Sequence, residues 1–158
     1  MMRILVTSDT HGDAASLRQA ILAQPQADVV IHLGDGENDV EQAKRSFPDK
    51  MFLQVRGNCD WASQLPTVGE YEAEGVRIFY THGHLYGVKS GDYQLISAAR
   101  ERKAQVALFG HTHLAREDYE DGLYLMNPGR LSGWEASYGI LDITPQGIVT
   151  NVVRLGGL

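Results

Sequence analysis

The chain has 158 residues, of which 43% are hydrophobic and 22% charged, and this length and composition predict one globular domain over residues 1–158. A net charge of −6 argues against the broad basic surface that strong nucleic-acid binding requires. The single cysteine excludes an intrachain disulfide framework, and the apolar run after Arg3 is too short for a signal peptide or a membrane span, so we expect a cytoplasmic protein without a membrane partner.

The first third of the sequence alternates between short apolar runs and helical segments. Strands are predicted over residues 3–7, 27–35 and 51–58, and helices over residues 14–24 and 38–47. The spacing of Leu17, Ile21 and Leu22 predicts the apolar face of the first helix. The order β-α-β-α-β predicts a parallel sheet with right-handed crossovers.

The pattern changes in the second part of the chain, where antiparallel pairs are expected. Hairpins are predicted around Glu74-Gly75, at Asp121-Gly122 and near Pro145-Gln146-Gly147, with a helix over residues 91–103 and a strand over residues 105–111. The sequence therefore predicts an α/β protein with two packed mixed β-sheets flanked by helices. A single mixed sheet is the alternative.

Polar side chains are concentrated directly after the predicted strands, and five of the six histidines lie there. The residues in these positions are Asp9, His11, Asp35, Asn58, His82, His84, His111 and His113. The carboxyl ends of parallel strands meet at one crevice, so these side chains are expected to lie close together. The i, i+2 spacing within Asp9/His11 and His111/His113 would place both side chains on one side of an extended backbone, where they can converge on one metal ion.

Each of these motifs has a simpler interpretation when it is taken alone. The Asp of "SDTHG" could cap the following helix, and "GDGEND" and "GNCD" could be turns. His32, inside the apolar "VVIHLG", is expected to be a hydrogen-bonded core residue and not a ligand. Together the motifs place metal-competent donors after five separate strands, which favours a metal site.

The motifs "SDTHG", "GDG", "GNCD", "THGH" and "GHTH" resemble those of the calcineurin-like metallophosphoesterase superfamily. With "NPGR" and the short length, they resemble its small bacterial and archaeal phosphodiesterase branch, and also the retromer subunit that shares this fold. The resemblance implies a four-layer α/β/β/α sandwich and two divalent metal ions per chain. The implied ligands are Asp9, His11 and His113 for the first ion, Asn58, His82 and His111 for the second, and Asp35 as the bridge.

The resemblance implies a phosphodiesterase that acts on a small phosphodiester by attack of a hydroxide shared by the two ions. The mixed nitrogen and oxygen donors suit transition metals, with manganese expected first and nickel, iron, cobalt or zinc as alternatives. Other functions compatible with the resemblance are a protein-binding scaffold with weak catalysis and a phosphatase acting on nucleotides or phosphoproteins. The oligomeric state is left open, and a homo-oligomer is one option.

Cys59 stands where many superfamily members carry a histidine that protonates the leaving group. A neutral thiol is a poor acid for this purpose, so we expect Cys59 to be a small, partly buried residue at the edge of the site, rather than a nucleophile or a ligand. His84 is a candidate for assisting the leaving group or contacting the phosphate, and a structural hydrogen bond is the alternative. Arg130 in "NPGR" is a candidate for binding the phosphate, and a surface or supporting role is the alternative. Without an obvious acid, the enzyme should prefer diesters with stable leaving groups to alkyl monoesters.

Overall fold

Two five-stranded sheets form the centre of the computed structural model, which describes residues 1–156. The first sheet has the order β10-β9-β1-β2-β3. Its strands are β1 (Met2–Thr7), β2 (Val29–His32), β3 (Met51–Gln54), β9 (Ser137–Thr144) and β10 (Gly147–Arg154). The first three are parallel, as the β-α-β-α-β pattern predicted, and β9 joins β1 in antiparallel orientation.

The second sheet has the order β4-β5-β6-β8-β7. Its strands are β4 (Val68–Ala73), β5 (Val76–Thr81), β6 (Val106–Leu108), β7 (Arg116–Glu120) and β8 (Leu123–Asn127). Strands β5, β6 and β8 are parallel, and the two outer strands pair with them as the predicted hairpins.

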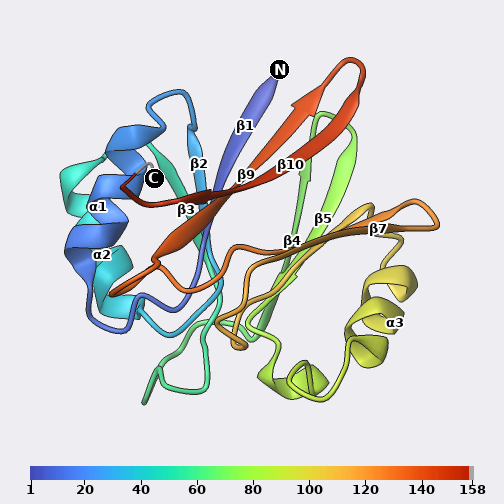
Figure 1. Cartoon of the computed structure of the whole chain (residues 1–158), viewed down its shortest axis with the longest axis horizontal. Helices are drawn as coiled ribbons and strands as arrows, with labels where there is room; N and C mark the ends of the chain where they lie inside the picture. The colour runs from blue at the N-terminus through green and yellow to red at the C-terminus, as the bar shows by residue number, and fades with distance from the viewer. Residues whose placement is uncertain (157–158) are drawn as a thin grey trace.

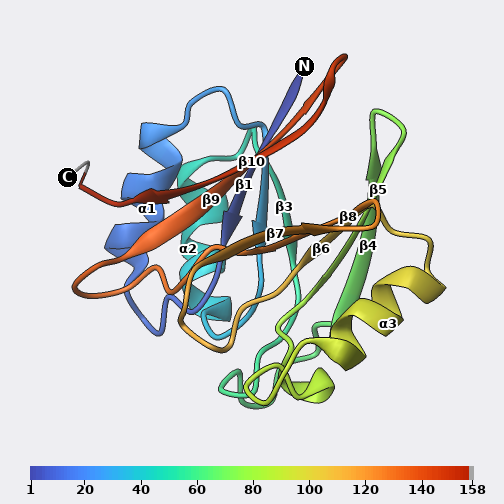
Figure 2. The same ribbon diagram turned by 45° about the vertical axis from the view of Figure 1, so that its right-hand side comes forward.

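The sheets pack face to face with helices outside (Figures 1 and 2), so the four-layer prediction is confirmed and the single mixed sheet is wrong. The helices are α1 (Ala14–Ala23), α2 (Glu37–Ser46), α3 (Tyr93–Glu101) and a short 3₁₀ helix, η1 (His84–Tyr86). Helices α1 and α2 cover the first sheet, whereas α3 covers the second (Figure 1). Within residues 1–156, no helix is long and apolar enough to cross a bilayer.

Alternation along β1 shows how the layers are held together. Ile4 and Val6 are buried between the two sheets, whereas Leu5 faces the helices and packs in the same cluster as Leu17. Each such fully buried aliphatic side chain stabilises the fold by about 1.5–3 kcal/mol. One prediction about α1 is wrong: Leu22 is 57% exposed, because the buried stripe of this helix passes through neighbouring positions instead.

The loops after β1, β2, β3, β5 and β6 lie together where the two sheets meet. The amide of Asp9 donates to the carbonyl of Gly34 at 3.0 Å, which joins the loops after β1 and β2. The amide of Gly110 donates to the carbonyl of His82 at 3.0 Å, which joins the loops after β6 and β5. Backbone hydrogen bonds therefore fix the positions of the loops that carry the polar motifs.

Candidate metal centre

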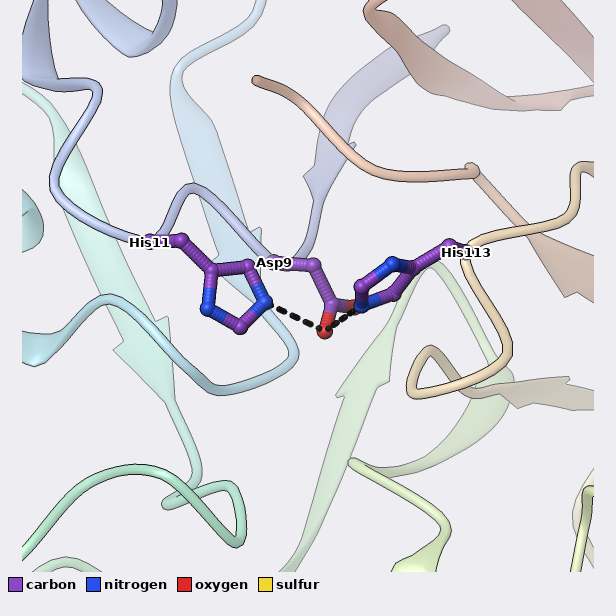
Figure 3. A group of neighbouring side chains, drawn as sticks. All are labelled: Asp9, His11 and His113. Carbon is purple, nitrogen blue, oxygen red and sulfur yellow. Dashed lines mark ion pairs between the residues drawn. The ribbon is translucent and has the colours of Figure 1, made fainter. Parts of the chain in front are cut away.

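Asp9, directly after β1, is fully buried at the junction of the two sheets. Its Oδ2 accepts hydrogen bonds from the hydroxyl of Ser8 and from the amide of His111, the latter at 3.1 Å. Its Oδ1 has no hydrogen-bond partner among residues 1–156. Instead, the Nε2 atoms of His11 and His113 lie 3.4 and 3.2 Å from this oxygen, and the rings approach it from opposite sides (Figure 3).

This first cluster has the features of a cation site. A buried carboxylate oxygen without a donor is costly unless a cation or a proton meets it. The donor atoms of Asp9, His11 and His113 all lie within 4.8 Å of one another. One carboxylate oxygen and two imidazole nitrogens form a mixed donor set that suits a divalent transition metal.

The second cluster is arranged around His82, whose imidazole is fully buried. Its Nδ1 lies 2.7 Å from the carbonyl oxygen of Leu33, which can only accept, so Nδ1 carries the proton in the neutral ring. The unprotonated Nε2 then faces Asn58 Oδ1 at 3.0 Å, His111 Nδ1 at 3.1 Å and Asp35 Oδ2 at 3.2 Å. Metal-binding histidines commonly hold their second nitrogen on a carbonyl in this way.

Asp35 lies between the two clusters and is 4% exposed. Its Oδ2 is 3.2 Å from His82 Nε2 and 3.7 Å from His11 Nε2, while its Oδ1 accepts the amide of Cys59 at 2.8 Å. Burial opposes ionisation, but His82, when its ring carries a second proton in the metal-free site, and the amide of Cys59 outweigh burial and hold the pKa of Asp35 below its usual range. The position of this carboxylate between the clusters is the one that a bridging ligand would need.

The backbone at these positions differs from the extended conformation assumed from the i, i+2 spacing. Five of the seven predicted ligands have positive φ values, between 46° and 69°: Asp9, His11, Asp35, His111 and His113. That assumption was therefore wrong, and His111 and His113 point to different clusters. Left-handed backbone is uncommon for residues other than glycine, and it persists only where the surrounding structure enforces it. Residues in this conformation are concentrated at functional sites.

Comparison with known proteins decides the family. The Calcineurin-like phosphoesterase superfamily domain matches residues 2–146. The chain belongs to this superfamily. It is 32% identical over 131 residues to the probable metallophosphoesterase YsnB of Bacillus subtilis, covering 82% of this chain and 75% of that protein. It is 29% identical over 171 aligned residues to the phosphodiesterase YfcE of Escherichia coli, covering 90% and 88%.

Solved structures support the same assignment. A conserved uncharacterized protein of Streptococcus pneumoniae, titled a predicted phosphoesterase, matches with a TM-score of 0.84 at 26% identity, over 99% of this chain and 91% of that chain. Vacuolar Protein Sorting 29 from Cryptosporidium parvum matches with a TM-score of 0.75 at 18% identity, over 97% of each chain, which shows a common fold alone. The predicted resemblance to the small phosphoesterase branch is confirmed.

Asp60 holds two loops of the site together, a role that the sequence motifs did not reveal. Its Oδ2 accepts the amides of Asp35 at 2.8 Å and Gly57 at 2.7 Å. Its Oδ1 accepts the amides of Gly36 at 3.0 Å and Glu37 at 3.2 Å, at the start of α2. One carboxylate thus joins the two loops that carry Asp35 and Asn58. The available signal was an acid three residues after a glycine, which is the spacing of many turns.

His32 confirms the prediction of a hydrogen-bonded core residue. It is 1% exposed, its Nδ1 accepts the amide of Gly34 at 3.2 Å, and its Nε2 lies 3.1 Å from the hydroxyl of Thr10. Because Nδ1 accepts, the proton of the neutral ring is on Nε2 and points to Thr10. Burial lowers the pKa of His32 to about 4. The neutral ring links the loops after β1 and β2.

Cys59 is exposed, so the prediction of a partly buried residue was wrong. The loop after β3 turns outward at this position, and the thiol lies at the rim of the site, with Sγ within 4.8 Å of donor atoms of His11 and Asp35. Desolvation of the thiol and the charge of Asp35 raise the pKa of Cys59. Without a bound ion the sulfur is therefore a neutral thiol, which is a weak nucleophile.

His84 and Arg130 occupy contrasting positions. His84 begins η1, with its ring centroid 5.4 Å from that of His82 and 6.1 Å from that of His111. Its Nδ1 is buried without a hydrogen-bond partner among residues 1–156, and burial and His82 lower the pKa of His84. Arg130 is exposed, although the next residue in its loop, Leu131, donates its amide to the carbonyl of Ser8 at 2.9 Å.

Proposed function

We propose that the chain is a single-domain phosphodiesterase that requires two divalent metal ions. The observation that carries this proposal is the pair of unmatched acceptor atoms at the sheet junction, Asp9 Oδ1 and His82 Nε2. The first is buried without a donor, and the second faces other acceptors because Nδ1 of the same ring is held by a carbonyl. Cations at these two places would satisfy both atoms.

Seven residues are proposed as the ligands of the two ions. The first ion would be held by Asp9, His11 and His113, the second by Asn58, His82 and His111, and both by Asp35. Mixed imidazole, carboxylate and amide donors favour manganese, iron, cobalt, nickel or zinc over calcium, and we expect manganese first. When bound, the ions would supply Lewis acidity and a hydroxide at neutral pH.

Charge explains how a protein with a net charge of −6 would attract a phosphate. Two divalent ions bring about four positive charges to a pocket whose ligands include two carboxylates, so the local charge is positive. Asn58 is neutral, and an acid at its place would reduce that local charge. A small anionic diester is therefore a suitable partner, in agreement with the phosphodiesterase named among the relatives.

His84 is proposed to contact the oxygen of the leaving group. Its lowered pKa makes the ring neutral at pH 7, so it would act as a hydrogen-bond donor and not as a strong acid. Arg130 is proposed to approach the phosphate from the loop that contacts the end of β1. Since Cys59 is a neutral thiol at the rim, we expect good turnover of diesters with stable leaving groups and poor turnover of alkyl monoesters.

The proposal is tested by hydrolysis of bis(p-nitrophenyl) phosphate after metal removal and addition of Mn²⁺. Activity should return with the ion in the wild-type protein and in Asp49→Ala, an exposed acid before β3, but not in Asp35→Ala. Equal activity of Asp35→Ala would contradict the bridging role. Absence of activity with every divalent ion, in folded protein, would contradict the enzyme and favour a protein-binding scaffold.

A further inference from the structure

A cleft of about 480 Å³ opens directly beside Asp35. Its walls are the loop after β1, the start of α2 and the loop after β3. His11 and Asp35 belong to both the cleft and the candidate metal centre, so the two are continuous. Among the residues described, none of the four histidines contributed by the second sheet lines this cleft.

Trp61 forms part of the cleft wall and is 88% exposed. The exposed indole is not needed to cover the core, because nearly all of its surface faces solvent. An aromatic ring on the wall of a cleft gives a flat surface on which another ring can stack, and such stacking is effective for nucleobases of any sequence.

The electrostatics of the cleft favour an uncharged occupant over a second phosphate. The amides of Gly36 and Glu37 at the start of α2, which could otherwise bind an anion, already donate to Asp60. No lysine or arginine is among the described residues that line the cleft. The carboxylate of Glu37 has no hydrogen bond or ion pair within residues 1–156, and with Asn38 it can accept hydrogen bonds from hydroxyl or amino groups.

The cleft is lined by His11 and Asp35, whereas His84 lies beside His82 and His111, which do not line it. If His84 contacts the departing oxygen, the other ester substituent points away from it. The cleft is therefore placed to receive the substituent that stays on the phosphorus.

We propose that this cleft binds the retained substituent of the diester and that Trp61 selects a planar, uncharged group with hydrogen-bond donors, such as a nucleoside. The inference rests on the proposed phosphodiesterase function. It names the substrate class as mononucleoside diesters, and it disfavours substrates whose retained group carries a further phosphate.

Two esters with the same leaving group test the selection. Thymidine 5′-(p-nitrophenyl phosphate) retains a nucleoside, whereas methyl p-nitrophenyl phosphate retains only a methyl group. Trp61→Ala should lower kcat/KM for the thymidine ester by about tenfold, through KM, as expected for loss of one stacked base. The methyl ester should change less than about twofold, Trp61→Phe should retain most of the activity, and Trp134→Ala, whose indole is 89% exposed elsewhere, should match wild type. Equal losses for both esters would overturn the proposal.

Binding without turnover provides an independent test, because the sequence contains only two tryptophans. The two indole N–H signals in a ¹⁵N correlation spectrum can be assigned with Trp61→Phe and Trp134→Phe. Titration with thymidine, with and without Zn²⁺, should shift the Trp61 signal in a saturable way and leave the Trp134 signal unchanged. Neither signal shifting, or both shifting alike, would overturn the cleft proposal. Inactive wild-type protein on both esters would instead contradict the enzymatic function, and the titration would still decide the cleft.

Discussion

The two sheets contribute different chemistry to the candidate metal centre. The loops of the first sheet carry both carboxylates, Asp9 and Asp35, which are 0% and 4% exposed. The loops of the second sheet carry four of the five histidines at the site, and the His113 side chain among them is 40% exposed. We call the first-sheet loops with Asp9 and Asp35 the acidic half, and the second-sheet loops with the four histidines the imidazole half. The carboxylates of the acidic half are buried and accept hydrogen bonds from backbone amides, whereas the imidazole half is partly open to solvent.

This difference shows that neither sheet can form the site alone. The buried negative charge belongs to the first sheet, and most of the neutral nitrogen donors belong to the second. Ions bound between them would link the sheets, so metal binding and sheet packing should be coupled, and the ions should stabilise the native state. Substitutions on the acidic side should therefore have larger effects than those on the imidazole side.

Asp9→Asn should cause the largest loss, because it removes a fully buried charge from the acidic half. We expect Mn²⁺ affinity to fall more than about 100-fold, since even outer partners of metal ligands are worth 10–100-fold. Thermal unfolding with and without Mn²⁺ measures this: the rise in Tm on metal addition should disappear. Asp28→Asn, an exposed acid directly before β2, is the control and should keep the rise. An unchanged Mn²⁺ response in Asp9→Asn would show that the acidic half is not the anchor.

His84→Ala examines the imidazole half, and its effect should depend on the leaving group. With an alkyl diester, whose alkoxide leaves poorly, turnover should fall by about 30-fold, because a hydrogen bond to a charged oxygen is lost. With an aryl diester the loss should stay within a few-fold, because the phenolate needs little assistance. The measurement is the slope of log kcat against the pKa of the leaving group, which should become steeper. An identical slope would remove His84 from the reaction.

The layers and the meeting point of the polar motifs were predictable, because hydrophobic periodicity and the convergence of parallel strand ends are local or topological rules. The parallel order of β1, β2 and β3 and the turn at Asp121-Gly122 follow from these rules directly. The backbone conformations of the predicted ligand residues were not predictable. Left-handed backbone at Asp9 or His111 is imposed by neighbouring loops through hydrogen bonds that are far apart in sequence.

The roles of Asp60, Trp61 and Cys59 could not be predicted from the sequence either. Asp60 and Trp61 follow the "GNC" motif as an ordinary acid and an ordinary aromatic residue, and only the folded loop shows that one is a cap and the other a cleft wall. Cys59 was placed incorrectly for the same reason, since exposure in a loop depends on the direction of the turn and not on residue type.

His32 links the first two loops of the acidic half only while its ring is neutral. Its folded pKa is about 4 and its ordinary value is 6.5, so its contribution to stability is complete above pH 6.5 and is lost as the pH falls toward 4. The contribution is about 3 kcal/mol. Metal-free wild-type protein should lose this amount between pH 7 and pH 4 in urea unfolding, and His32→Asn should lose much less.

Wild type and His32→Asn are compared by the slope of the unfolding free energy against pH, not by its absolute value. Asp35 and His82 have pKa shifts of their own, lowered and raised respectively, but both are present in wild type and variant. The charge of His82 also lowers the pKa of His32, so the difference between the proteins reports His32 together with its coupling to His82. Parallel slopes in the two proteins would mean that His32 is not the buried neutral base that its hydrogen bonds indicate.

Asp60→Asn should have the smallest effect and gives the finest test of how the acidic half is held. An asparagine retains one acceptor oxygen, but its amide group faces backbone N–H groups, so about half of the four hydrogen bonds are lost. We expect about tenfold weaker Mn²⁺ binding and a loss of about 1 kcal/mol in unfolding free energy, with Asp49→Asn as the control. Titration calorimetry separates two roles: a loss of stability with unchanged affinity would make Asp60 a helix cap alone, whereas weaker affinity would show that it positions Asp35 for the ion. All four donors follow strands of the first sheet in the chain. The second outcome would therefore show that the acidic half sets the position of Asp35 in the site.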